Sequence, residues 1–172
     1  MIEFRPLTAD DLTLMRAWLE RPHVRLWWRE PIDEAMAKRL VRDATDEYVI
    51  VVDGRPVGMI QTYLVAAYPE WGEIVGSEPG LAGVDIVIGE EEFIGRGLGP
   101  LVLAEFADEV VFSNAATTAV VATVEEGNRR SWRAFEKAGF QHVRDVEEEG
   151  LPHRLMRLDR PLRSVRGPVQ DP

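Results

Sequence analysis

Hydrophobic and polar positions alternate in some parts of the chain and recur every three to four residues in others, which indicates a mixture of strands and helices. The opening stretch "IEFRPL" alternates and predicts a strand. Thr8 and Asp11 then have the spacing of a capping box, in which side chains satisfy the exposed N–H groups at a helix start, so a helix is expected over about residues 9–19. A second helix is predicted from apolar residues at helical spacing, namely Ile32, Met36, Leu40 and Val41.

The middle of the chain contains the clearest local pattern. In "YVIVVDGRPVGMIQTYLV", two β-rich runs flank Asp53 and Gly54, a dipeptide suited to the positive φ angles of a tight turn, and they predict a hairpin. The next residues, 68–82, contain three glycines and two prolines and show no consistent period. We therefore expect a loop there.

The second half of the chain alternates strands with helices. "GVDIVIG" predicts a short strand that leads into a glycine-rich loop and a helix over about residues 98–112. "TAVVATV" predicts another strand, "NRRSWRAFEKAGF" a helix stopped by Gly139, and "QHVRDVEE" with "LPHRLMRLD" a closing hairpin. Because no linker or repeat divides the 172 residues, we expect one α/β domain over residues 1–160 and a frayed tail over residues 161–172.

Composition narrows the possible partners. The 20 Lys and Arg residues against 30 Asp and Glu residues give a formal charge of −10, which argues against nucleic acid and membrane partners and suits a cationic small molecule or basic peptide. Acidity of this kind also serves simple solubility. The chain has no cysteine, and its three histidines lack metal-ligand spacing, so no metal site is expected. With no basic leader or apolar span, we expect a cytoplasmic protein, either a monomer or a homodimer.

The stretch "EEFIGRGLGPLVLAEFADEV" places Gly95, Gly97 and Gly99 around Arg96, directly before a helix. A dinucleotide fingerprint needs its third glycine one residue later, and a Walker loop needs Gly-Lys-Ser or Gly-Lys-Thr, so neither motif fits. Consecutive N–H groups at a helix N-terminus still bind phosphate oxygens, and Arg96 adds positive charge. The loop therefore predicts a pyrophosphate site, although the glycines also suit a tight strand-to-helix turn without a ligand.

The order of elements, "IGRGLG" before a helix, and "NRRSWRAFEKAGF" about thirty residues later together resemble the GNAT superfamily of acetyl-coenzyme A dependent N-acetyltransferases. Through "HVRLWW", "DGRPVGMIQTY", "EPGLAGVDIVI" and "GRGLGPLVL", the chain is similar over nearly its whole length to the aminoglycoside 6'-N-acetyltransferases and the related siderophore lysine acetyltransferases. The resemblance implies a mixed, largely antiparallel sheet of about six to seven strands flanked by about four helices, with a splayed pair of central strands. It also implies acetyl-coenzyme A as cofactor and direct transfer to an amine in a ternary complex.

The cofactor site implied by the resemblance follows the pattern Q/R-x-x-G-x-G/A, which holds the coenzyme A pyrophosphate and falls here on Ile94, Gly97 and Gly99. Ile94 departs from the usual Gln or Arg. The pantetheine arm would lie along the first splayed strand, where a main-chain N–H serves as oxyanion donor. The implied cofactor contacts are Ile86, Val87, Ile88, Ile94, Gly95, Arg96, Gly97, Leu98, Gly99, Asn128, Arg133 and Phe135.

Two positions of the implied cofactor site allow other interpretations. Phe135 stands where many members of the superfamily carry a tyrosine that protonates the leaving thiolate, so water or a neighbouring group would have to do so here. Arg133, with Arg129 and Arg130, could reach phosphates or could simply form a charged helix face.

The acceptor site implied by the resemblance centres on Asp85, whose "GVD" matches the acid similarly placed in the aminoglycoside enzymes. A carboxylate there can hold an ammonium group and accept its proton, which makes Asp85 the candidate base, with a solvent-facing acid at a strand edge as the alternative. Thr123 stands where several of these enzymes carry an Asp. The predicted substrate contacts are Trp28, Trp71, Glu73, Glu78, Asp85 and Glu125.

Other roles remain open for these residues and for the chain. The tryptophans could pack in the core, and the glutamates could belong to a solvated loop. The acceptor could be a lysine-like amine rather than an aminoglycoside. A domain that only senses acetyl-coenzyme A is a further alternative, and Asp85 discriminates against it because a sensor needs no base.

Overall fold

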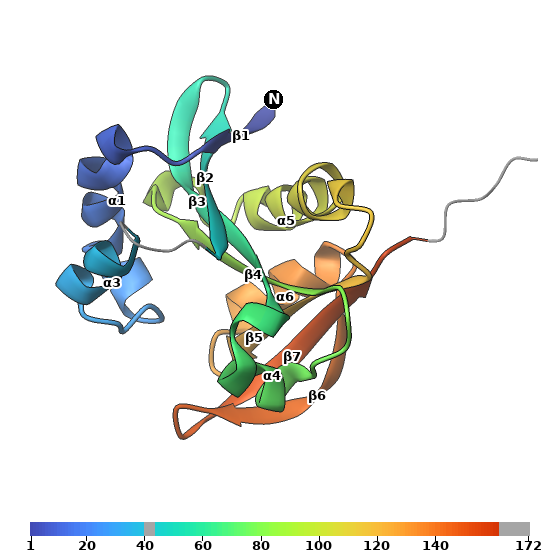
Figure 1. Ribbon diagram of the computed structural model, residues 1–172. Helices are drawn as coiled ribbons and strands as arrows, with labels where there is room; N and C mark the ends of the chain where they lie inside the picture. The colour runs from blue at the N-terminus through green and yellow to red at the C-terminus, as the bar shows by residue number, and fades with distance from the viewer. Residues whose placement is uncertain (40–43, 162–172) are drawn as a thin grey trace, which may run out of the picture.

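The computed structural model of the protein describes residues 1–39 and 44–161. Figure 1 shows a central sheet with helices on both of its faces. The order of the strands and α-helices is β1 (Ile2–Pro6), α1 (Leu12–Leu19), α2 (Pro22–Arg25), α3 (Ile32–Arg39), β2 (Thr45–Val52), β3 (Arg55–Leu64), α4 (Pro69–Val75), β4 (Leu81–Ile88), α5 (Leu98–Glu109), β5 (Ala119–Glu125), α6 (Arg129–Lys137), β6 (Gln141–Glu148) and β7 (Leu151–Asp159).

The seven strands lie in the order β1-β2-β3-β4-β5-β7-β6 in the described part of the chain. Every neighbouring pair is antiparallel except β4 and β5, which run parallel. Their pairing covers only three positions and stops at Gly83 and Val121, although both strands continue. This confirms the predicted mixed sheet with a splayed central pair.

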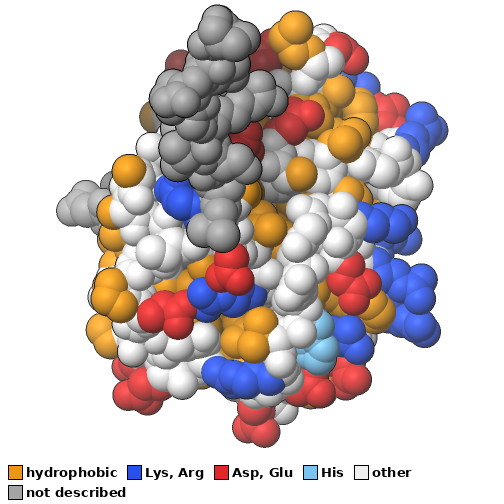
Figure 2. Space-filling model, turned by 90° about the vertical axis from the view of Figure 1, so that its right-hand side faces the viewer, with side chains coloured by type: hydrophobic (Ala, Val, Ile, Leu, Met, Phe, Trp, Pro, Cys, Tyr) orange, Lys and Arg blue, Asp and Glu red, His pale blue; other side chains and the backbone are white. Residues whose placement is uncertain are grey.

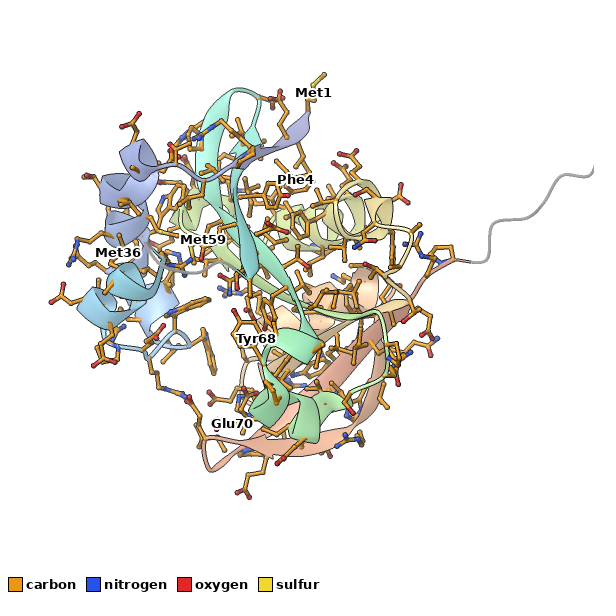
Figure 3. All side chains as sticks on the ribbon, viewed as in Figure 1. Met1, Phe4, Met36, Met59, Tyr68 and Glu70 are labelled. Atoms are coloured by element: carbon orange, nitrogen blue, oxygen red, sulfur yellow. The ribbon has the colours of Figure 1, made fainter. Side chains whose placement is uncertain are left out.

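The two faces of the sheet are covered by different helices. On one face, α1 and α3 bury a cluster that includes Trp18, Met36 and Met59, and Figure 3 shows the two methionines on this side of the sheet. On the other face, α5 and α6 cover a larger cluster around Phe106, against which Phe4 packs edge-on with its ring centroid at 5.0 Å. Hydrophobic residues of β4 and β5 belong to these clusters, so the core holds both strands in place where they separate.

Most predicted local structure is confirmed. Thr8 and Asp11 form the capping box, with the Thr8 N–H donating to the Asp11 carboxylate at 2.9 Å. Asp53 and Gly54, with φ angles of 49° and 80°, turn the chain from β2 into β3. Gly139, with a φ of 98°, follows the end of α6.

The predicted loop over residues 68–82 is wrong in its first half. Residues Pro69–Val75 form α4, which begins with a proline at a position where a helix needs no N–H donor. Val75 is buried in a cluster with β4, β5 and β7, and Ile74 packs against it. This contact with the sheet forms the helix despite Gly72 in its middle. The short helices α2 and α4 come in addition to the four predicted helices.

Some predictions concern residues outside the described ranges. Leu40 and Val41, expected in the second helix, lie there, and so does the predicted tail from residue 162 onward. No helix within residues 1–39 and 44–161 is long and apolar enough to cross a membrane.

Candidate active site

A cavity of about 1290 Å³ lies where β4 and β5 separate. The two strands line it beyond the last position at which they pair with each other, from Val84 to Ile88 on β4 and from Ala122 to Glu125 on β5. Because β3 pairs with only one edge of β4, the other edge presents main-chain groups to the cavity over this stretch. The predicted contacts Ile86, Val87 and Ile88 all belong to the lining.

The glycine loop forms another wall of the cavity. Gly95 and Gly97 have φ angles of 77° and 84°, and no atom lies within 4 Å of the position that a Cβ would occupy at either residue. These glycines are therefore required by backbone conformation, and they leave open space in front of the first turn of α5. Ile94 and Gly99 also line the cavity.

The two remaining predicted residues of this loop lie differently. Leu98 is 9% exposed and belongs to the core beneath α5. Arg96 is exposed and is absent from the cavity lining among the described residues. A ligand held by the glycine loop would therefore meet main-chain N–H groups first, and Arg96 would act only by reaching over from the surface.

Helix α6 contributes the basic side of the cavity. Arg129, Arg130, Arg133 and Lys137 all line it. The side-chain oxygen of Asn128, which also lines the cavity, accepts a hydrogen bond from the Ser131 N–H at 3.2 Å and so caps this helix. Figure 2 shows Lys and Arg side chains gathered along one edge of the face that it presents, despite the acidic composition.

Phe135 lies at the boundary between this cavity and the core. It is 2% exposed and packs edge-on against Phe140, with ring centroids 5.0 Å apart. Its ring offers no proton donor, in agreement with the predicted departure from a tyrosine at this position.

Asp85 lies two residues beyond Gly83, the last position of β4 that pairs with β5. Its carboxylate oxygen Oδ2 accepts a hydrogen bond from Nε2 of Gln61 at 2.7 Å, and Tyr63 of the same strand β3 lies near enough to respond to its charge. Burial, together with the negative charge of Asp85, raises the pKa of Tyr63 well above its ordinary value, so Tyr63 remains neutral. Asp85 is thus half-buried in the lining of the cavity and held by a strand neighbour.

A second carboxylate of the cavity, Glu125, is engaged by a cation. Arg29 binds it through both terminal nitrogens, at 2.7 and 3.1 Å, and this hydrogen bonding lowers the pKa of Glu125. Beside this pair, Trp27 lies against Gly127. The segment between α2 and α3 is thereby tied to the end of β5 across the cavity.

Trp28 and Glu148 line the same region and have unused polar atoms. The indole Nε1 of Trp28 and the carboxylate Oε2 of Glu148 are buried, and neither finds a hydrogen-bond partner among the residues that the structure describes. Since buried polar atoms normally have partners, these two atoms remain available to hydrogen-bond a molecule in the cavity.

Three predicted substrate residues lie outside the lining of the cavity. Trp71 packs against Tyr63, with ring centroids 5.5 Å apart, and against the backbone of Gly83. Glu73 is exposed on α4, and Glu78 forms an ion pair with Arg157. Trp71 thus supports the site from behind, and the structure does not bring these two glutamates into it.

Sequence reasoning missed several lining residues. Gln61 lies opposite Asp85 only because of the register between β3 and β4. Glu30 precedes α3, Glu34 lies in its first turn, and Glu148 and Glu149 belong to the β6–β7 hairpin. A polar residue at the centre of a hydrophobic strand was the one available signal, and it pointed to Gln61. No group of three or more His, Cys, Asp or Glu residues suited to a metal ion occurs in the described ranges.

The features above fit acetyl-coenzyme A: N–H groups in front of α5 and basic side chains on α6 suit its phosphates, and the unpaired edge of β4 suits its pantetheine arm. Comparison with known proteins gives the same answer. A family model described as an acetyltransferase (GNAT) domain matches residues 8–148.

Individual relatives extend this match. The chain is 25% identical over 151 residues to aminoglycoside N(6')-acetyltransferase type 1 of Klebsiella pneumoniae, covering 81% of this chain and 74% of that protein. It is 24% identical over 164 residues to N(6)-hydroxylysine O-acetyltransferase of Escherichia coli, covering 92% of this chain and 51% of that protein. Solved structures of aminoglycoside acetyltransferase AAC(6')-Ib with coenzyme A, and with coenzyme A and kanamycin, superpose with a TM-score of 0.83 at 25% identity, covering 93% of this chain and 95% of theirs. The chain belongs to the GNAT acetyltransferase family and is an acyltransferase that uses acetyl-coenzyme A.

Proposed function

We propose that this enzyme acetylates a primary amine of a cationic small molecule, with the 6'-amine of an aminoglycoside as the leading acceptor. One observation carries the proposal: Asp85 lies in the cavity directly beyond the point where β4 and β5 separate, oriented by Gln61. An amine must lose its proton before it can attack a carbonyl, and this carboxylate is placed to hold the ammonium and take that proton.

The other residues of the cavity divide the remaining work. The main chain of the glycine loop and the α6 side chains Arg129, Arg130 and Arg133 hold the phosphates. A main-chain N–H on the unpaired edge of β4 donates to the carbonyl oxygen on which charge develops. The cofactor supplies an acetyl thioester, whose C–S bond breaks as the new C–N bond forms. Since Phe135 offers no proton, water protonates the departing thiolate. The thiolate can leave without an acid beside it, because a thiol has a pKa of only about 8–9.

The charges that line the cavity support a cationic acceptor. Carboxylates come from the segment before α3, from its first turn, from β4 and from the β6–β7 hairpin, namely Glu30, Glu34, Asp85, Glu148 and Glu149. Trp28 adds an aromatic face and a buried N–H donor, which suits the hydroxyl or ether oxygen of a sugar. The Klebsiella relative and the kanamycin complex concern proteins that act on or bind aminoglycosides, and they favour this acceptor over a simple alkylamine.

The second candidate is transfer to a lysine-like substrate, which the hydroxylysine acetyltransferase relative favours. It would use the same cofactor site and the same Asp85. A domain that only senses acetyl-coenzyme A is less well supported, because it gives no reason for Gln61 to hold Asp85 by a hydrogen bond inside the cavity.

An acceptor panel tests the proposal. Release of free thiol from acetyl-coenzyme A is followed with kanamycin, paromomycin, lysine, N6-hydroxylysine and a lysine peptide. Paromomycin carries a hydroxyl in place of the 6'-amine and is the matched control. We expect turnover with kanamycin and little with paromomycin, whereas turnover confined to the lysine compounds would replace the aminoglycoside proposal with the second candidate.

A further inference from the structure

A row of polar side chains crosses three strands on the face that α1 and α3 cover. Glu47 of β2 is the direct cross-strand partner of Gln61 of β3, and Gln61 is the direct partner of Asp85 of β4. Directly paired residues have neighbouring side chains on one face of a sheet. The row therefore connects the candidate base to the interior of the protein on its α3 side.

Arg39 of α3 lies at the inner end of this row. Its side chain is only 2% exposed, and that of Glu47 is 10% exposed. The Nη1 atom of Arg39 donates to Oε1 of Glu47 at 2.5 Å and, at the longer distance of 3.4 Å, to Oε1 of Gln61. Because Glu47 balances its charge, Arg39 can remain buried beside the hydrophobic cluster of α1 and α3.

Arg39 determines which end of the Gln61 amide meets Asp85. A guanidinium group only donates hydrogen bonds, so the Gln61 oxygen must face Arg39 and the NH₂ group must face the opposite side. On that opposite side it donates to Oδ2 of Asp85 at 2.7 Å. With the amide reversed, two oxygens would face each other, and the carboxylate would lose a donor that favours its charged form.

Arg39 also contacts the acceptor side of the cavity. Its guanidinium carbon lies 5.7 Å from the centre of the Trp28 ring, which lines the cavity. Arg39 itself is absent from the lining among the described residues. It therefore touches both the support of the base and the wall of the acceptor site, without being available to touch substrate.

We propose that Arg39 is a positioning residue for acetyl transfer, which acts by fixing the Gln61 amide so that its NH₂ group holds the Asp85 carboxylate toward the acceptor amine. This inference rests on the proposed function, because it takes Asp85 as the base. It assigns a catalytic consequence to a buried ion pair that lies outside the cavity, and it predicts that Arg39 and Gln61 act as one unit.

A double-mutant cycle tests the inference in the full-length protein with kanamycin. The first arm is Arg39→Met with Glu47→Gln, which removes the ion pair without leaving a buried charge. The second arm is Gln61→Met, and the third combines all three substitutions. General-base catalysis contributes about 10²–10⁴-fold, so misplacing the base should lower kcat about tenfold in each arm, while KM for acetyl-coenzyme A stays within about twofold. The combined arm should fall no further than either arm alone.

Two further variants separate positioning from folding. Arg39→Lys keeps the positive charge and a hydrogen-bond donor, so its kcat should be closer to that of the wild type than to that of the first arm. If the first arm does not fold, Arg39→Lys and Gln61→Met are compared instead. Arg16→Met with Asp33→Asn is the control. This 2.7 Å ion pair joins α3 to α1, and neither residue lines the cavity. The control should retain kcat within about twofold.

The outcomes distinguish this inference from the proposed function. Losses of kcat that multiply in the combined arm, or an unchanged kcat in the first and second arms, would overturn the role of Arg39 while leaving Asp85 as base. If Asp85→Asn retains wild-type kcat, the proposed base is wrong and the positioning role falls with it.

Discussion

Gly58 offers a test of how closely β3 must approach β4 for the cofactor site to form. A Cβ added at Gly58 would lie 2.1 Å from the main-chain oxygen of Val87 and 3.0 Å from the Cα of Ile88. Both atoms are backbone atoms of β4, so no side-chain rotation can relieve the overlap. Substitution by alanine must therefore move the strand whose other edge faces the cavity.

The size of the effect follows from this overlap. Ordinary contact begins at 3.4 Å, so the Gly58→Ala backbone must shift by about 1 Å. Overpacking of this kind costs about 1–3 kcal/mol, and for a chain of this length each kcal/mol lowers Tm by about 2–4 °C. We expect Gly58→Ala to lower Tm by about 2–12 °C. A displacement of about 1 Å at a binding edge should also raise KM for acetyl-coenzyme A at least about fivefold.

Thermal unfolding and initial-rate kinetics measure both effects. Gly72→Ala is the matched control, because its Cβ would meet only ordinary contacts, the nearest at 3.5 Å, and alanine favours the interior of helix α4 by about 0.5–1 kcal/mol. The control should have an unchanged or slightly higher Tm and an unchanged KM. A Gly58→Ala variant with wild-type Tm and KM would refute the close approach of β3 and β4 as a requirement of the site.

Three further predictions concern charge. Asp85→Asn should lower kcat with kanamycin by about 10²-fold or more while acetyl-coenzyme A binding, measured by calorimetry, stays within about twofold; equal losses in both would contradict a base. Glu148→Gln should raise KM for kanamycin about tenfold with little change in kcat, since it removes a buried acceptor oxygen for an ammonium group; a change in kcat alone would exclude this binding role. Hydrogen bonds from Arg5 and Thr8 hold the pKa of Asp11 below its ordinary 3.8, so Asp11 stabilises the fold above that pH and the stabilisation is lost as the pH falls below it. Asp11→Asn should thus lower the free energy of unfolding at pH 7 by about 1 kcal/mol, or Tm by about 2–4 °C. This difference from the wild type should shrink steadily below pH 3.8, and a constant difference would contradict it.

Local signals predicted much of the fold because they depend on neighbours in sequence. The Asp53–Gly54 turn, the capping box at Thr8 and the stop at Gly139 each need only a backbone conformation or a side chain three residues away. The glycine loop was recognisable for the same reason, since Gly95 and Gly97 adopt positive φ angles directly before a helix.

The parts that sequence reasoning missed depend on distant contacts. Helix α4 exists because Val75 packs against strands far away in sequence, which outweighs a central glycine. Gln61 meets Asp85 only through strand register, and Glu125 proved to be paired with Arg29, 96 residues away. Glu78 carried the right charge for a substrate contact, yet it lies outside the cavity lining and is paired with Arg157.

The most direct test of the account is the identity of the product formed from kanamycin and acetyl-coenzyme A. We predict a single product with one added acetyl group, located by NMR on the 6'-amine, at a rate that depends on Asp85. Acetylation at another amine would contradict the assigned acceptor position. No acetylated product, with coenzyme binding intact, would contradict acetyl transfer to aminoglycosides altogether.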